Sequence, residues 1–344
     1  MLDSGPSPPP VVMSSVALPY EFGAPAPFDA SPDRPRSISR SVPTSDRIFR
    51  GLAAAAAVTS LFIIAGTAIF LAWNARGAVG HVGFGKFLTT SLWNPPARQF
   101  GVFGLLVNGV LIAVIALMIG APLAVGLALF VNEYAPATVR KWLTSAIDLL
   151  AALPSLIFGI WGFFALSGPL QGVSQWFSDH LSAIPIFRLP PGSKLSNSAF
   201  IAGVVVGIMV TPIITSVTRD VMAQCPRVQC EAALALGGTR WGMIRAVLIP
   251  FGRSGTVGAI LLGFGRALGE TIAIAIIMTL QATPNTRVLS SGGGSIAAWI
   301  ATKFPEAGAD ELSALVGAGM ALFLLTLIVN LGARRIVNRA RLTT

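Results

Sequence analysis

The sequence has 344 residues, of which 53% are hydrophobic and only 11% charged, and its mean hydropathy is +0.74. Soluble domains carry about 25% charged residues, and a chain of this size cannot hide so much apolar surface in a core. The composition therefore excludes ordinary soluble enzymes and predicts an integral membrane protein. The formal net charge of +10 needs its own explanation, because it would otherwise indicate a nucleic-acid partner.

The first 46 residues differ in composition from the rest of the chain. Residues 1–46 are rich in Pro and Ser and poor in large apolar side chains, which predicts a disordered cytoplasmic tail. The first apolar run begins too deep in the chain, and is too long, for a secretory signal peptide. We therefore expect this run to be retained as a helix, and residues 47–344 to form one membrane domain.

Six segments are apolar and long enough to cross a bilayer, which takes about 20 helical residues. None of them alternates with period 2, so helices are the expected spanning structure. The sequence thus predicts an all-α integral membrane protein with six transmembrane helices. The expected spans are 51–73, 102–131, 145–166, 199–217, 255–281 and 312–333.

The distribution of basic residues explains the net charge and predicts the orientation. If the N-terminus is cytoplasmic, sixteen of the 24 Lys and Arg residues lie in cytoplasmic segments, seven lie in outer loops, and Arg266 lies within a span. This is the positive-inside bias, with some attraction to anionic lipid. We therefore expect a multi-pass protein of the bacterial cytoplasmic membrane, with both termini inside and no nucleic-acid partner.

The sequence holds no motif for catalysis of its own. Gly80 to Lys86 imitates the start of a phosphate-binding loop, but Phe87 stands where Ser or Thr would hold magnesium. Cys225 and Cys230 are too few for a disulfide framework or a zinc site and are read as free thiols. We expect no enzyme activity, metal or cofactor, so any ATP hydrolysis must come from another chain.

A cytoplasmic segment after the fourth span has the pattern of two short helices. A first helix is expected over 227–236, and it ends at Gly237 and Gly238 because glycine tolerates the backbone of a helix end. Thr239 can cap a second helix that runs toward Pro250. Such a hairpin could dock in a groove of a partner protein, or it could lie as an amphipathic helix on the membrane surface.

The same segment resembles the EAA motif of ABC importer permeases. Glu231, Ala232 and Ala233, with Gly237 six residues and Pro250 nineteen residues after the Glu, reproduce its spacing. In that family the motif forms coupling helices that sit in a cleft of the cytoplasmic ATPase. The resemblance implies this role here and strongly disfavours the membrane-surface alternative.

Two charged residues in the fifth span are candidates for the substrate pathway. Arg266 lies near the middle of 255–281, where a charge costs at least about 2.5 kcal/mol. Glu270 follows four residues later, so we expect both side chains on one helix face. They could be a structural pair, or they could line a path for an anion, since the Arg fork suits an oxyanion. Gly265 and Gly269 are expected to allow close helix approach there.

The wider sequence resembles the PstC-type permeases of phosphate ABC transporters over about residues 47–335. The segments that carry this resemblance are Gly265 to Thr271, Phe87 to Gly101 with its Trp-Asn-Pro, Asp148 to Ser155, and Gly159 to Gly162. In that family the Arg and Glu of the fifth-span motif matter for phosphate passage, which implies this role for Arg266 and Glu270.

The resemblance also implies a set of partners. These are a second, PstA-type permease, a PstB-type ATPase dimer, and a PstS-type phosphate-binding protein that delivers inorganic phosphate to the outer loops 74–100, 167–198 and 282–311. Asp148 is read as a helix-end or interface residue rather than as a gate. The alternatives are a permease for sulfate or molybdate, a secondary transporter driven by an ion gradient, and a membrane scaffold or sensor without transport.

Overall fold

The structure is a computed structural model that describes residues 44–189 and 192–341, apart from the side chains at 78, 81, 333, 334 and 336–341. It divides into two compact units, Met1–Val58 and Thr59–Thr344. Most of the predicted tail lies outside the described residues, and its last three residues, from Thr44, belong to the first helix. That helix, α1 (Thr44–Asn74), runs across the boundary between the units.

The described residues confirm a mostly helical membrane protein with six helical runs long and apolar enough to span a bilayer. The long helices of the second unit are α4 (Phe103–Leu129), α5 (Ala137–Ala152), α8 (Ala199–Ala223), α11 (Ile249–Leu268) and α14 (Ala309–Arg341). The shorter ones are α2 (Arg76–Val82), α3 (Phe84–Thr89), α6 (Ser155–Trp161), α7 (Ser167–His180), α9 (Arg227–Ala235), α10 (Arg240–Met243), α12 (Ile272–Ile277) and α13 (Ile296–Lys303). Four helical turns of other types are η1 (Phe130–Tyr134), η2 (Gly162–Leu166), η3 (Ile244–Leu248) and η4 (Phe304–Glu306).

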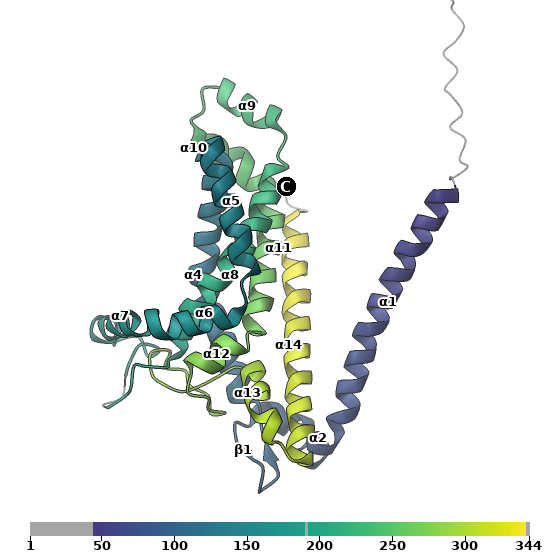
Figure 1. The fold of residues 1–344 in the computed structure, drawn as a ribbon, viewed down its shortest axis with the longest axis vertical. Coiled ribbons are helices and arrows are strands. Elements are labelled where there is room, and N and C mark those ends of the chain that lie inside the picture. Colours follow the sequence, from purple (N-terminus) through teal and green to yellow (C-terminus); the bar gives the residue numbers. More distant parts are fainter. Residues whose placement is uncertain (1–43, 190–191, 342–344) are drawn as a thin grey trace, which may run out of the picture. The chain divides into compact units, whose positions relative to one another are not determined.

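The core of the second unit is the close pairing of α4 with α8, against which α11 packs (Figure 1). A Cβ added at Gly207 would lie 2.8 Å from the carbonyl oxygen of Ala116, and one added at Gly120 would lie 2.8 Å from that of Gly207. Small residues allow two membrane helices to approach until their backbones touch. Substituting either glycine would therefore push α4 and α8 apart.

The third predicted span, 145–166, is wrong in its bounds. The helix α5 ends at Ala152, because Leu153 is extended (φ −66°, ψ 138°) and Pro154 follows it. A residue before proline is pushed away from helical geometry, and proline lacks the N–H that would continue the ladder. Length and composition mark Ser155–His180 as a candidate span, yet Figure 1 shows α6 and α7 crosswise to α4, while α5 lies along the bundle.

The fifth predicted span, 255–281, is also wrong in its bounds. The helical run begins at Arg240, passes through α10 and η3, and ends with α11 at Leu268. Residues 269–271 break the run, and the short helix α12 starts at Ile272. This break changes how the two charged candidates of the span lie with respect to each other.

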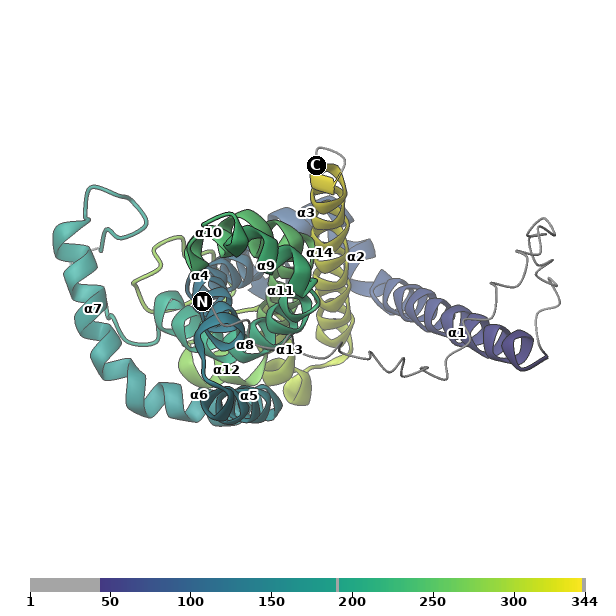
Figure 2. The ribbon, with the colours of Figure 1, turned by 90° about the horizontal axis from the view of Figure 1, so that it is seen from above.

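The end of the unit opposite α9 is more ordered than the loop predicted for 74–100 (Figure 1). It contains α2, α3 and a small antiparallel hairpin of β1 (Trp93–Asn94) and β2 (Gln99–Phe100). The hairpin is joined to α14 by an indole hydrogen bond from Trp93 to Glu311 (2.9 Å) and an ion pair between Arg98 and Asp310 (3.0 Å). Viewed along the bundle, α7 extends to one side of the α4, α8 and α11 cluster (Figure 2).

Candidate functional site

Arg266 lies on the wall of a cavity of about 710 Å³ between α8, α11 and α14. Its side chain is exposed, and within the described ranges it has neither a hydrogen bond nor an ion pair. The other lining residues are uncharged: Ile213, Gly258, Leu261, Leu262, Gly265 and Asn330. A guanidinium without a carboxylate partner in an apolar wall keeps its donors available for an anion.

Glu270 does not share a helix face with Arg266, so the expectation that both side chains lie on one face is wrong. The helix ends at Leu268, and the chain turns through Gly269 before Glu270. The carboxylate of Glu270 is buried, and its Oε1 accepts a hydrogen bond from the backbone N–H of Ala273 at 3.1 Å. The spacing of four residues places two side chains together only while the helix continues.

The role of Glu270 in the structure is to hold the break between α11 and α12. Its side chain caps the first turn of α12, and its backbone carbonyl accepts a hydrogen bond from Ser295 Oγ at 3.0 Å. The same Ser295 Oγ caps α13 by accepting from the N–H of Ala298 at 3.1 Å. One buried carboxyl residue thus ties the end of α11 to two later helices.

The glycines beside Arg266 do not pack as expected. A Cβ added at Gly265 would meet no atom within 4 Å, so this glycine faces the open cavity. Close packing occurs two residues earlier, where a Cβ at Gly263 would lie 2.5 Å from Ile214 Cδ1 on α8. Gly263 therefore allows the approach of α11 to α8, and Gly265 leaves space next to Arg266.

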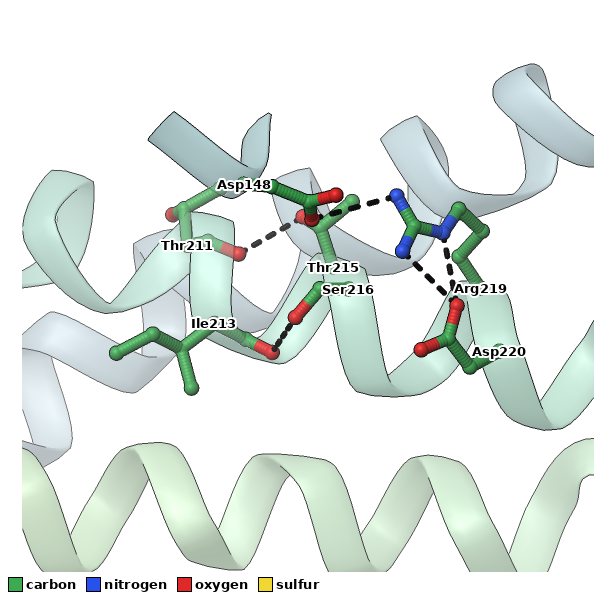
Figure 3. A network of polar contacts seen from close by, with 7 residues as sticks. All are labelled: Asp148, Thr211, Ile213, Thr215, Ser216, Arg219 and Asp220. Atoms are coloured by element: carbon green, nitrogen blue, oxygen red, sulfur yellow. Dashed lines mark hydrogen bonds and ion pairs between the residues drawn. The ribbon is translucent and has the colours of Figure 1, made fainter. Parts of the chain in front are cut away.

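A second polar cluster joins α5 to α8 (Figure 3). Arg219, whose side chain is only 12% exposed, lies 3.5 Å from Asp148 Oδ1 through Nη1 and 2.9 Å from Asp220 Oδ1 through Nη2. The backbone carbonyl of Arg219 also accepts a hydrogen bond from Asn132 Nδ2 at 3.0 Å. Asp148 is thus an interface residue, and the cluster holds the ends of η1, α5 and α8 together.

The predicted helical hairpin is present as α9 and α10. Gly237 has a φ of +82°, a conformation that glycine adopts without strain, and the turn follows directly after α9. Thr239 caps α10 by accepting a hydrogen bond from the N–H of Gly242 at 3.1 Å. The second helix does not stop near Pro250, because it continues through η3 into α11. Pro250 lies inside this run, shortly after the π-helical turn η3.

The residues of the EAA pattern lie at the surface of the hairpin. No residue of α9 is buried, and the side chains of Val228 and Leu236 are 75% and 90% exposed. Exposed apolar groups on a charged, solvent-facing hairpin are typical of a surface that binds another protein. Of the pattern itself, Glu231, Ala232, Gly237 and Pro250 are exposed and Ala233 is half-buried.

A small apolar cluster anchors the hairpin on the ends of α4 and α8. It contains Met222, Met243, Ile244 and Leu248, packed against Leu129 and both cysteines. The cysteines are free thiols, as expected, with their Sγ atoms 3.8 Å apart. Burial, followed by the hydrogen bond and charge of Cys230, raises the pKa of the Cys225 thiol from its ordinary value of 9.0 to about 11.

Two residues of these sites were not among the candidates predicted from the sequence. Arg219 was counted only as a basic loop residue, and its place in the ion-pair cluster depends on how α5 folds back on α8. Asn330 was treated as part of an apolar span. It is the only carboxamide of 312–333, and this lone polar side chain could have marked it as a candidate. Within the described part of the chain, no group of three or more His, Cys, Asp or Glu residues could hold a metal.

Comparisons with known proteins agree with this arrangement. Residues 120–342, which include the hairpin and the Arg266 cavity, match the family described as "Binding-protein-dependent transport system inner membrane component". The chain is 39% identical over 299 residues to the Mycobacterium tuberculosis protein named phosphate transport system permease protein PstC 2, covering 85% of this chain and 92% of that one. It is 34% identical over 331 residues to the Xylella fastidiosa PstC permease, covering 95% and 98%.

Solved structures show the same fold. A bacterial alginate ABC transporter, solved with an alginate-bound periplasmic protein, contains a chain that matches with a TM-score of 0.57 at 15% identity, covering 86% of this chain and 96% of that one. A second structure of a bacterial alginate importer matches with a TM-score of 0.55. At this identity the likeness concerns the fold, which is that of ABC transporter permeases. The chain is a multi-pass inner-membrane protein that belongs to the binding-protein-dependent transport system inner membrane components and, within them, to the PstC permeases.

Proposed function

We propose that this chain is a membrane-spanning subunit of an ATP-driven importer of inorganic phosphate. The observation that carries the proposal is the unpaired, exposed guanidinium of Arg266 on the wall of an apolar cavity, in a chain of the PstC family. A planar Arg fork donates two parallel hydrogen bonds to an oxyanion, which suits phosphate. A single Arg binds a dianion loosely enough to release it.

The cavity is proposed as this subunit's share of the translocation pathway. One wall is α11, and an open face between α8 and α14 is available to a second permease subunit of PstA type. Glu270 contributes by fixing the break that ends α11 beside Arg266, rather than by pairing with Arg266 in the state described. The role of both residues in phosphate passage rests on the family resemblance and on this geometry.

The hairpin α9–α10 is proposed as the contact for the ATP-hydrolysing subunits, a PstB-type dimer. Glu231, Ala232, Ala233, Gly237 and Pro250 carry the motif, and the hairpin surface is exposed. Because α10 continues through η3 into α11, a displacement of the hairpin is carried along one helical run to Arg266. The chain itself then supplies no ATPase site.

The orientation follows from the basic residues. We propose that α9, the N-terminus and the C-terminus face the cytoplasm, because most Lys and Arg residues lie at that side. The opposite end, with α2, α3, the β1–β2 hairpin and α13, then receives a phosphate-loaded binding protein of PstS type. Membrane lipid covers the remaining apolar faces.

The most direct test of the substrate is uptake of radiolabelled phosphate by the reconstituted complex, with and without ATP and with excess sulfate or molybdate as competitor. We expect uptake that requires ATP, is competed by unlabelled phosphate, and is not reduced by sulfate or molybdate. Uptake that persists without ATP in an ion gradient would indicate a secondary transporter. Equal competition by sulfate would instead assign the complex to a different oxyanion.

A further inference from the structure

Asn330 is the second polar side chain on the wall of the Arg266 cavity. It belongs to α14, so it enters the cavity from a different helix than Arg266 does. Its side chain is exposed, and it has no polar partner among the residues that the structure describes. A polar side chain within a membrane span is costly unless it meets water, a partner group or a ligand. An unpartnered amide at a cavity wall is therefore placed to meet what enters the cavity.

The chemistry of the cavity gives this amide a role that Arg266 cannot fill. An Arg side chain has five N–H donors and no acceptor, whereas an Asn side chain has both an NH₂ donor and a carbonyl acceptor. The remaining lining residues are Ile213, Gly258, Leu261, Leu262 and Gly265, which bring no polar side-chain atom. The backbone carbonyls beside them lie within helices, where they accept helical hydrogen bonds. Asn330 Oδ1 is thus the side-chain acceptor of the described cavity wall.

A hydrogen-bond acceptor can distinguish between oxyanions that an Arg side chain alone would bind equally well. Inorganic phosphate near neutral pH keeps at least one proton on an oxygen, and that O–H can donate a hydrogen bond. Sulfate carries no proton at this pH and presents only acceptors. A carbonyl oxygen that meets a sulfate oxygen finds no donor and opposes a negative charge, so a site that presents its acceptor to the anion disfavours the one that lacks an O–H.

We propose that Asn330 is a substrate-contacting, specificity-determining residue, which accepts the hydrogen of a protonated oxyanion while Arg266 donates to its charged oxygens. This proposal rests on the proposed function, since it assigns a role in the same cavity. It makes the permease itself selective for phosphate. Arsenate, which keeps its proton in the same way, is also accepted, and sulfate is not.

The test uses a thiol reporter in the intact reconstituted complex. Cys225→Ser and Cys230→Ser remove the native thiols, and Leu262→Cys places a reporter on the cavity wall, where the native side chain is 55% exposed. The modification rate by a negatively charged methanethiosulfonate is measured with increasing inorganic phosphate, arsenate or sulfate at equal ionic strength. The comparison is then repeated with Asn330→Leu, which keeps the branched shape of the side chain but removes its polar atoms, and with Leu331→Ala as a control on the same helix.

With Asn330 present, we expect half-maximal protection at an about fivefold lower concentration of phosphate or arsenate than of sulfate, the effect of about one hydrogen bond. Asn330→Leu should abolish the difference by weakening protection by phosphate, and Leu331→Ala should leave it unchanged. Equal protection by phosphate and sulfate with Asn330 present, or a preference that survives Asn330→Leu, would overturn the role of Asn330 while the cavity remains the anion path. Absence of protection by any anion, in a complex that still imports phosphate, would overturn the pathway assignment as well.

Discussion

The two ends of α11 differ in how exposed their surroundings are and in the role that we propose for them. At one end, α11 is continuous with η3 and α10 and leads to an exposed hairpin in which no residue of α9 is buried. At the other end, the helix stops at Leu268, and the buried carboxyl group of Glu270 fixes the break. The exposed end can bind a partner without rearranging the core, and the buried end can hold Arg266 in a defined position.

Between these ends lies a continuous helical run. From Arg240 to Leu268 it has 29 residues, which at 1.5 Å per residue is about 43 Å of helix. Gly252, Gly255 and Gly263 bring the run against α8, where added Cβ atoms would lie 3.1, 2.5 and 2.5 Å from side-chain atoms of α8. We call the run Arg240–Leu268 the rod; because it is continuous and packed against α8, a displacement of the hairpin can be carried along it to Arg266. Substitutions at three positions and one alkylation measurement test how the two ends of this rod differ.

The largest effect is expected from breaking the rod between its ends. Ser254 is half-buried and lies within α11, well before Arg266. Ser254→Pro removes a helical hydrogen bond and clashes with the preceding turn, at a cost of about 3 kcal/mol or more. We expect phosphate imported per ATP hydrolysed to fall at least about tenfold, because the kink separates the hairpin from Arg266.

The matched control for the broken rod is Ser254→Ala, which keeps the helix and should import phosphate within about twofold of the unchanged complex. Both variants must be recovered in similar amounts as assembled complexes. A proline variant that assembles and imports phosphate at the normal ratio to ATP would show that the rod is not the route of coupling.

The next effect concerns the exposed end. Glu231→Lys reverses the charge of an exposed side chain on a helix without buried residues, so the protein should insert and fold normally. We expect association with the ATPase dimer, measured by co-purification and by ATPase titration, to weaken roughly tenfold if the hairpin docks there. Gln229→Lys, on the same exposed helix but outside the motif, is the control. Equal association of both variants would argue against a docking role for Glu231.

A smaller effect is expected at the buried end, where two substitutions of Glu270 separate shape from charge. Glu270→Gln keeps an oxygen that can accept from the N–H of Ala273, whereas Glu270→Ala removes the cap, at a cost of about 1 kcal/mol. We expect Glu270→Ala to lower uptake severalfold and Glu270→Gln to retain most of it. If Glu270→Gln were as inactive as Glu270→Ala, the negative charge itself would be needed, for instance in another state of the cycle.

The smallest effect concerns the cysteines that anchor the hairpin. With a pKa of about 11 in place of 9.0, Cys225 should form about a hundredfold less thiolate near pH 8 than an unshifted thiol. Alkylation of Cys225 in the unchanged chain, followed by mass spectrometry of the peptide that contains this residue, should therefore be slow at pH 8 and accelerate as the pH approaches 11. Since the folded state holds this proton more tightly, its contribution to stability is present below pH 9 and is lost between pH 9 and 11. Rapid alkylation at pH 8 would show that the thiol is not shielded.

The contrast between the ends also shows what could be predicted from sequence. The hairpin was predicted closely, because its signals are local: Gly237 at a positive φ and the Thr239 cap act within a few residues. The expectation that Arg266 and Glu270 share one helix face was wrong, because the helix end depends on hydrogen bonds of Glu270 with Ala273 and Ser295 that no local pattern reveals. The break at Leu153 and Pro154 had a local signal that the apolar composition of the span concealed.

The site was predictable only in part for the same reason. An Arg in an apolar span is visible in the sequence, so Arg266 was found. Its neighbour Asn330 comes from another helix, and the ion pair between Arg219 and Asp148 requires α5 to fold along α8. Such contacts between helices distant in the sequence need the tertiary structure.

The central claim is that Arg266, at the end of this rod, meets the phosphate. The most direct measurement follows phosphate uptake and ATP hydrolysis together in proteoliposomes that contain the complete complex, with Arg266→Ala, Arg266→Lys and the unchanged chain. We predict that Arg266→Ala still hydrolyses ATP but imports at least about tenfold less phosphate, and that Arg266→Lys, which keeps the charge without the fork, lies between. Unchanged uptake in an assembled Arg266→Ala complex would contradict this account and leave Arg266 without a role in the pathway.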